Sequence, residues 1–128
     1  MDAEHGTAVR GDVIAEIRGL AAGLEPAFFE RLVATYVGDG KRHLDAMRRA
    51  LAVRDAEAWR LEAHSMKGAS ASVGAERLAE LCRSAESAPV VPDGAAEALL
   101  REAHEEFARV RAALAAETSR SSRTGELS

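Results

Sequence analysis

Three neighbouring residues, His64, Lys67 and Gly68, have the types and spacing that a chemical site needs. On a helix, the third and fourth residues after His64 lie beside it on one face, and Ala71 extends that face by a turn. A glycine inside a helix lowers its stability by about 1 kcal/mol relative to alanine. An exposed imidazole beside an ammonium, with little bulk around them, therefore indicates a patch that another molecule approaches closely.

The chemistry that fits this patch is phosphoryl transfer through the imidazole. A histidine side chain is mostly neutral at pH 7, so it is a nucleophile that needs no separate base. The ammonium of Lys67 can pair with the phosphoryl oxygens while charge redistributes during transfer. Gly68 leaves room for the active site of another protein to close over His64 and exclude water.

The helix that carries the patch is predicted to run from about Ala56 to Val73. Asp55 is expected to be its N-cap, and Gly74 to end it in a left-handed conformation. The apolar face of this helix, with Ala69 beside it, is expected to pack on the core and consists of Trp59, Ala63, Met66, Ser70 and Val73. His64 lies on the solvent side. Ser70 and Ser72 are expected to serve close helix packing and not catalysis.

The segment before this helix contains a short helix and a longer one. Asp12 is expected to cap the short helix, which ends between Gly19 and Gly23. Its apolar residues are Val13, Ile14, Ile17 and Leu20. Pro26 suits the first turn of the longer helix. Gly38 and Gly40 could break that helix in two or lie exposed within it, and a single long helix is favoured.

Two more helices and a tail follow. One helix is expected from about Ala75 to Ser87, after which Pro89 and Pro92 mark a turn. Asp93 is expected to cap the last helix, and no apolar stripe continues beyond Glu117. The stripe of that helix is Leu99, Leu100, Ala103 or His104, Phe107, Val110 and Leu114.

These segments predict an all-α protein, an antiparallel four-helix bundle with a short additional N-terminal helix. The expected divisions are a lead-in with the short helix (1–23), the bundle (24–116) and a disordered tail (117–128). A β-rich fold is disfavoured, because β-branched residues are few and no alternating run occurs.

Composition narrows the possible functions of the chain. Its 128 residues suffice for one domain, and a formal net charge of −4 disfavours binding to nucleic acid. The single cysteine, Cys82, excludes an intrachain disulfide and is expected to be an inert core thiol. No apolar run is long enough to span a membrane, and the N-terminus does not have the pattern of a signal peptide. We therefore expect a cytoplasmic protein without membrane contact.

Other candidate sites in the sequence are weaker. His5, His43 and His104 are expected to be structural or merely exposed, with His43 paired to Asp39 on the surface. No helix contains Glu-x-x-His, which removes a di-metal carboxylate centre. The run from Gly38 to Lys41 lacks the preceding strand and the following Ser or Thr of a phosphate-binding loop.

The sequence resembles the histidine-containing phosphotransfer (HPt) domain in the run Ala63-His64-Ser65-Met66-Lys67-Gly68-Ala69-Ser70-Ala71-Ser72-Val73-Gly74-Ala75, followed by Arg77-Leu78-Ala79-Glu80-Leu81-Cys82 and Glu86. The family's signature is A-H-x-L-K-G-x-S-x-x-x-G-A, then L-x-x-x-C and an acidic residue. The resemblance extends over roughly residues 24–115, and the signature lies within 63–86. Met66 and Ala85 stand where leucine is usual or common, and Gly38 and Gly40 interrupt what is generally continuous helix.

The resemblance implies a role in a phosphorelay. His64 is then the phosphorylated residue, Lys67 stabilises the phosphoryl group and Gly68 contacts the partner. Ala71, which lies on the same exposed face, is expected to contact the partner as well. The implied partners are a response-regulator receiver domain and a sensor or hybrid histidine kinase. No cofactor is expected on this chain, with Mg²⁺ held only by the receiver domain.

Because the sequence has no nucleotide-binding motif, we expect a covalent phosphoryl carrier without kinase activity of its own. It is expected to be a monomer and a separate polypeptide, with a domain of a hybrid kinase as the alternative. The alternative is a non-catalytic helical adaptor that docks receiver domains without accepting phosphate.

Overall fold

The computed structural model describes residues 8–24 and 27–127, with side chains through Arg120. Within these residues the protein has five α-helices and no strand, so the prediction of an all-helical fold is confirmed. The helices are α2 (Gly11–Ala21), α3 (Phe28–Ala52), α4 (Ala56–Ser72), α5 (Glu76–Ser87) and α6 (Ala95–Leu127). None of them is long and apolar enough to cross a membrane.

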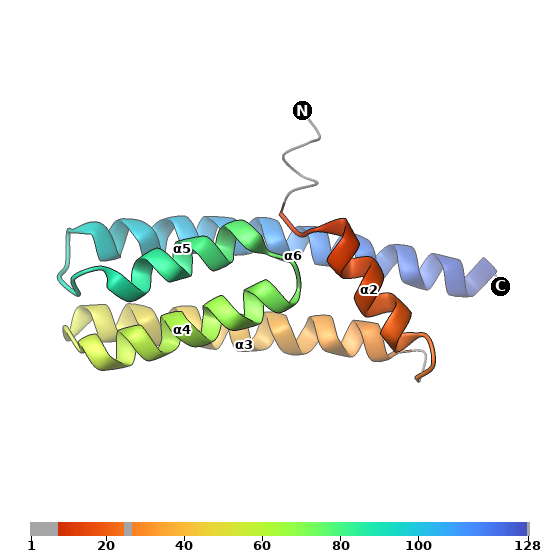
Figure 1. Ribbon diagram of the computed structural model, residues 1–128, viewed down its shortest axis with the longest axis horizontal. Coiled ribbons are helices and arrows are strands. Elements are labelled where there is room, and N and C mark those ends of the chain that lie inside the picture. Colours follow the sequence, from red (N-terminus) through yellow and green to blue (C-terminus); the bar gives the residue numbers. More distant parts are fainter. Residues whose placement is uncertain (1–7, 25–26, 128) are drawn as a thin grey trace, which may run out of the picture.

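Helices α3 to α6 lie side by side, and Figure 1 shows α4 and α5 in front of α3 and α6. α4 contacts α3 and α5, and α6 contacts the same two helices, so each of the four has two neighbours. One face of the molecule is therefore formed by α4 and α5, and the opposite face by α3 and α6. The short helix α2 lies across α3.

The core is filled mainly from the four packed helices. Its fully buried large side chains include Trp59 and Met66 on α4, Met47 on α3 and Leu78 on α5. The indole Nε1 of Trp59 donates a hydrogen bond of 2.7 Å to the carbonyl of Ala85. Because a buried N–H must find an acceptor, this bond links α4 directly to α5.

The ends of α4 follow the sequence prediction. The Asp55 carboxylate accepts a hydrogen bond from the Ala58 N–H at 3.1 Å, so Asp55 is the N-cap. Gly74 has φ +79°, and the N–H groups of Gly74 and Ala75 donate to the carbonyls of Ala71 and Ser70. This is a Schellman motif, which lets the chain reverse into α5 within a few residues.

Helix α3 is continuous through Gly38 and Gly40, which confirms a single long helix. Gly40, however, is buried and not exposed. A methyl group placed on it would lie 2.6 Å from Phe107 Cε1 and 3.2 Å from Met66 Cε. Glycine at this position therefore allows the Phe107 ring of α6 to pack directly on the backbone of α3.

Two predicted N-caps are wrong. Arg10 is the N-cap of α2, because its N–H donates to the Gly74 carbonyl at 2.9 Å and fixes an earlier start. Asp12 instead lies in the first turn, where its charge suits the helix dipole. Asp93 has φ +64°, and α6 begins two residues later, with the Gly94 carbonyl accepting from Ala98. An Asp-Gly pair is a turn signal, and here the turn prevails over the cap.

Helix α6 continues to Leu127, where the sequence predicted a disordered tail from Glu117. Arg18 of α2 donates to Glu117 Oε1 at 2.8 Å, and the Thr118 hydroxyl donates to the Leu114 carbonyl. These bonds hold the first residues beyond the apolar stripe.

In α2, Leu20 is exposed instead of belonging to the apolar face. The expectation for Pro26 lies outside the described residues.

Candidate functional site

The candidate site is a group of three side chains on the face formed by α4 and α5. His64 and Lys67 come from α4, and Glu86 comes from the last turns of α5. The Glu86 carboxylate lies between the two, with Oε2 3.2 Å from His64 Nδ1 and Oε1 2.7 Å from Lys67 Nζ. The three residues are therefore one connected network.

Exposure differs sharply within this network. The His64 side chain is 67% exposed, whereas those of Lys67 and Glu86 are 31% and 20% exposed. The carboxylate is thus partly covered while the imidazole projects into solvent. An incoming molecule meets the imidazole first, with the ammonium one turn further along the helix.

The charge state of Glu86 decides what the imidazole can do. The Lys67 ammonium, and to a smaller extent His64, hold the pKa of Glu86 below its usual value and outweigh the effect of desolvation. Glu86 is therefore ionised at pH 7 and can only accept hydrogen bonds. In the contact with Glu86, His64 Nδ1 must carry the proton, which leaves the Nε2 lone pair of a neutral ring available to a partner.

The surface next to His64 has little side-chain bulk. Gly68 and Ala71 are both exposed, and a methyl group placed on Gly68 would meet nothing within 4 Å. The Ser72 hydroxyl donates to the Gly68 carbonyl at 3.0 Å, so it is engaged with its own helix. All of the residues that the sequence placed on this face lie on it.

The opposite side of α4 holds the site in position. Trp59, Ala63, Met66 and Ser70 are buried as predicted, while Val73 is half-buried. The buried Ser70 hydroxyl is 2.9 Å from the hydroxyl of Tyr36 on α3. Ser70 therefore serves contact between helices, in agreement with the expectation from the sequence.

The other histidines and the cysteine do not join the site. His43 Nδ1 lies 2.7 Å from Glu62 Oε1 of α4, which corrects the predicted pair with Asp39, since Asp39 pairs with Arg42. His104 is exposed, and Ala103 takes the core position of α6. Burial raises the pKa of the Cys82 thiol to about 12, as expected of an inert core residue. His5 lies outside the described residues.

No group of three or more His, Cys, Asp and Glu side chains that could hold a metal ion occurs within the part of the chain that the structure describes. His64 and Glu86 alone offer only two such ligands.

Glu86 is the site residue to which the sequence assigned no role. It appeared only as the acidic residue that closes the resemblance, four positions after the buried Cys82. Residues four apart share a helix face, so Glu86 lies on the side of α5 that turns toward α4. Its partner His64 is 22 residues away in the sequence and on another helix, so the spacing of residues along a single helix cannot predict their contact.

The chain belongs to the Hpt domain family, whose model matches residues 31–117. Among solved structures the chain is similar to histidine-containing phosphotransfer protein B (HptB) from Pseudomonas aeruginosa PAO1. The two share 31% identity with a TM-score of 0.77, and the match covers 88% of this chain and 96% of the other. No curated protein matches the chain.

Proposed function

We propose that this protein is a phosphorelay intermediate that accepts a phosphoryl group on His64 and exchanges it with the aspartate of a receiver domain. The observation that carries the proposal is the contact of Glu86 with both His64 Nδ1 and Lys67 Nζ. This contact orients the imidazole of His64 as a nucleophile and holds the Lys67 ammonium close to it. Membership of the Hpt family and the likeness to HptB support the same assignment.

The transfer step follows from the state of the imidazole. The Nε2 lone pair of His64 attacks the phosphorus of an aspartyl phosphate, and the bond between phosphorus and the aspartate oxygen breaks as the carboxylate leaves. The ring keeps its Nδ1 proton and becomes cationic. Glu86 then faces a positive ring, so it stabilises the product in addition to fixing the tautomer.

Lys67 and the small residues take separate roles. The Lys67 ammonium can reach from Glu86 toward the phosphoryl oxygens and stabilise their charge. Gly68 and Ala71 form the exposed surface of small residues on which the receiver domain docks. The arrangement of α3 to α6 is consistent with the antiparallel four-helix bundle expected of the family, with α2 as the short additional helix.

We also infer that the protein is a monomeric, cytoplasmic carrier that binds no cofactor, nucleic acid or membrane. A sensor or hybrid histidine kinase supplies the phosphoryl group, directly or through a receiver domain, and any Mg²⁺ is held by the receiver.

The test is phosphoryl uptake from a purified, phosphorylated receiver domain. A phosphocarrier acquires an acid-labile, base-stable phosphate on His64, whereas the adaptor binds the receiver and stays unlabelled. ¹⁵N NMR of the His64 imidazole nitrogens separately tests the contact between Glu86 and His64 Nδ1. The expected spectrum is that of a ring protonated at Nδ1, and a ring protonated at Nε2 would contradict the role given to Glu86.

A further inference from the structure

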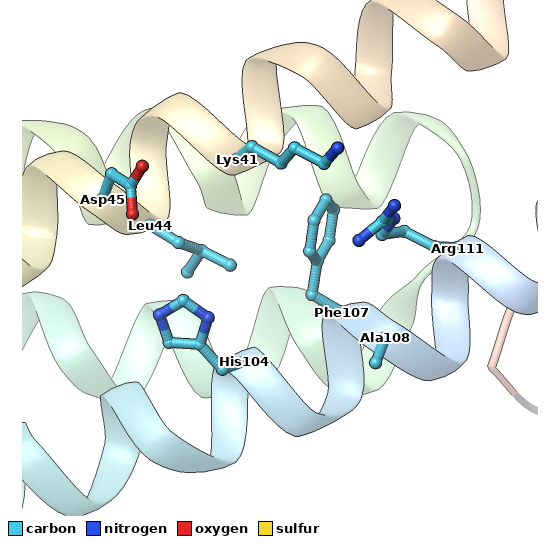
Figure 2. Close-up of a pocket in the computed structure, with 7 residues that line it drawn as sticks. All are labelled: Lys41, Leu44, Asp45, His104, Phe107, Ala108 and Arg111. Carbon is cyan, nitrogen blue, oxygen red and sulfur yellow. The ribbon is translucent and has the colours of Figure 1, made fainter.

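The face opposite His64 contains a groove between α3 and α6. It has a volume of about 150 Å³ and is open to solvent on one side. Its lining residues are Lys41, Leu44, Asp45, His104, Phe107, Ala108 and Arg111, which Figure 2 shows as sticks. Leu44 and Phe107 are buried, so the floor of the groove is apolar.

The groove carries two cations at one end. Lys41 on α3 and Arg111 on α6 both lie next to the Phe107 ring, from opposite walls (Figure 2). The guanidinium carbon of Arg111 is 5.8 Å from the centroid of that ring. A cation held against an aromatic face has fewer conformations to lose when it binds an anion.

Neither cation forms an ion pair with a carboxylate among the residues whose side chains are described. Asp45, the one acidic residue of the groove, pairs with Arg48 at 3.0 Å. In Figure 2, Asp45 lies toward the His104 end, away from Arg111. The Lys41 and Arg111 end is therefore a positive spot on a chain whose formal net charge is −4.

We propose that this groove docks an acidic segment of a partner protein, by taking one carboxylate side chain between Lys41 and Arg111. The methylene groups of a glutamate fit on the apolar floor while its carboxylate meets the two cations. Ion pairs at an open surface are too weak to retain a free small carboxylate, so flanking contacts from a longer segment are required.

The groove and the candidate site lie on different faces of the molecule. His64 and Glu86 belong to α4 and α5, whereas the groove belongs to α3 and α6 on the other face (Figure 1). A protein bound in the groove leaves the imidazole open to a receiver domain. The docking site itself does not depend on the proposed phosphotransfer, but its use as a tether during transfer does.

NMR titration of the ¹⁵N-labelled full chain tests the docking site. The probe is an acetylated octapeptide of alternating glutamate and leucine, and the controls are the glutamine–leucine peptide, acetate and inorganic phosphate. We expect saturable amide shifts at residues 41–45 and 104–111 with the glutamate peptide alone. Equal binding of the glutamine peptide, or shifts confined to other residues, would overturn the proposal. Saturation by phosphate would show an anion site instead of a peptide site and would also overturn it.

Charge variants make the test specific to the two cations. Lys41→Gln and Arg111→Gln are each expected to weaken peptide binding about two- to fivefold, the effect of one exposed ion pair. Arg83→Gln removes the same charge from an exposed position on α5 and should leave binding unchanged. The double variant Lys41→Glu/Arg111→Glu should instead bind a lysine–leucine peptide. If neither single variant weakens binding, the groove is not the site.

A final measurement separates this inference from the proposed function. Saturating glutamate peptide should leave the rate of phosphoryl uptake by His64 unchanged, and a slower rate would refute the tether. If the protein takes up no phosphate under any condition, the proposed function fails while the peptide result stands by itself.

Discussion

Two glycines inside helices, Gly40 and Gly68, are expected to respond in opposite ways to substitution by alanine. Both are interior to long helices, so alanine improves helix propensity by about 1 kcal/mol in each case. At Gly68 nothing lies within 4 Å of the added methyl group. Gly68→Ala should therefore stabilise the protein by about 1 kcal/mol.

Gly40→Ala meets a rigid neighbour. The new methyl group would lie 2.6 and 2.7 Å from two carbons of the Phe107 ring. That ring is 4% exposed and packs edge-on against Tyr36 at 6.0 Å, so it can yield only toward the groove between α3 and α6 and would lose this packing if it moved. Overpacking of this kind costs about 1–3 kcal/mol, which at least offsets the propensity gain of about 1 kcal/mol and leaves a net destabilisation of up to about 2 kcal/mol.

Thermal and urea unfolding measure the difference, with Gly38→Ala as the matched control. Gly38 is in the same helix, two residues before Gly40, and its nearest neighbour is the end of the Arg42 side chain at 3.8 Å. Gly38→Ala should behave like Gly68→Ala, with the midpoint of thermal unfolding raised by roughly 4 °C. If Gly40→Ala is as stable as Gly38→Ala, the contact between Phe107 and α3 is not rigid, and the reasoning from packing fails.

The remaining predictions concern the site. His64→Gln should unfold at the same midpoint as wild type, because the side chain is exposed, and should take up no phosphate; labelling of this variant would place the phosphate on another histidine. Lys67→Ala should slow single-turnover transfer about ten- to a hundredfold, since one charge-assisted contact contributes about 1.5–3 kcal/mol, and an unchanged rate would make Lys67 an ordinary surface residue. The pKa of Glu86 is lower in the folded than in the unfolded protein, so its ionisation stabilises the fold above the unfolded pKa and this contribution is lost as pH falls through the folded pKa. Wild type should thus exceed Glu86→Gln in stability at pH 7 and converge with it in acid, whereas a gap that does not depend on pH would contradict the ion pair. Gly68→Gln should fold but accept phosphate slowly from a receiver domain while phosphoramidate still labels it normally, and a wild-type rate from the receiver would move the docking surface elsewhere.

The sequence predicted the features that depend on residues within one or two turns. Asp55 caps α4 and Gly74 ends it, because both roles are set by hydrogen bonds to residues at most five positions away. The buried and exposed faces of α4 follow from the spacing of its apolar residues in the same way. Local periodicity was therefore enough to place His64, Lys67 and Gly68 on an exposed face.

Features that depend on contacts between distant segments could not be predicted. The role of Glu86 requires knowing how α5 is rotated against α4, and the burial of Gly40 requires knowing where the Phe107 ring of α6 lies. The contact of His43 on α3 with Glu62 on α4 could not be predicted for the same reason. The start of α2 depends on a bond from Arg10 to Gly74, far along the chain, which no local capping rule contains.

The tight reversal between α4 and α5 restricts how the length of the chain can vary. His64 and Glu86 are separated by 22 positions, and the stretch between them is helix except for the short turn at Val73–Ala75. One inserted or deleted residue in a helix rotates everything beyond it by about 100°. Such a change within α5 would carry the Glu86 carboxylate away from the imidazole, and within the turn it would destroy the Schellman bonds at Gly74. Insertions and deletions can be absorbed after Ser87, in the irregular segment before α6, but hardly anywhere between His64 and the carboxylate of Glu86 that contacts it.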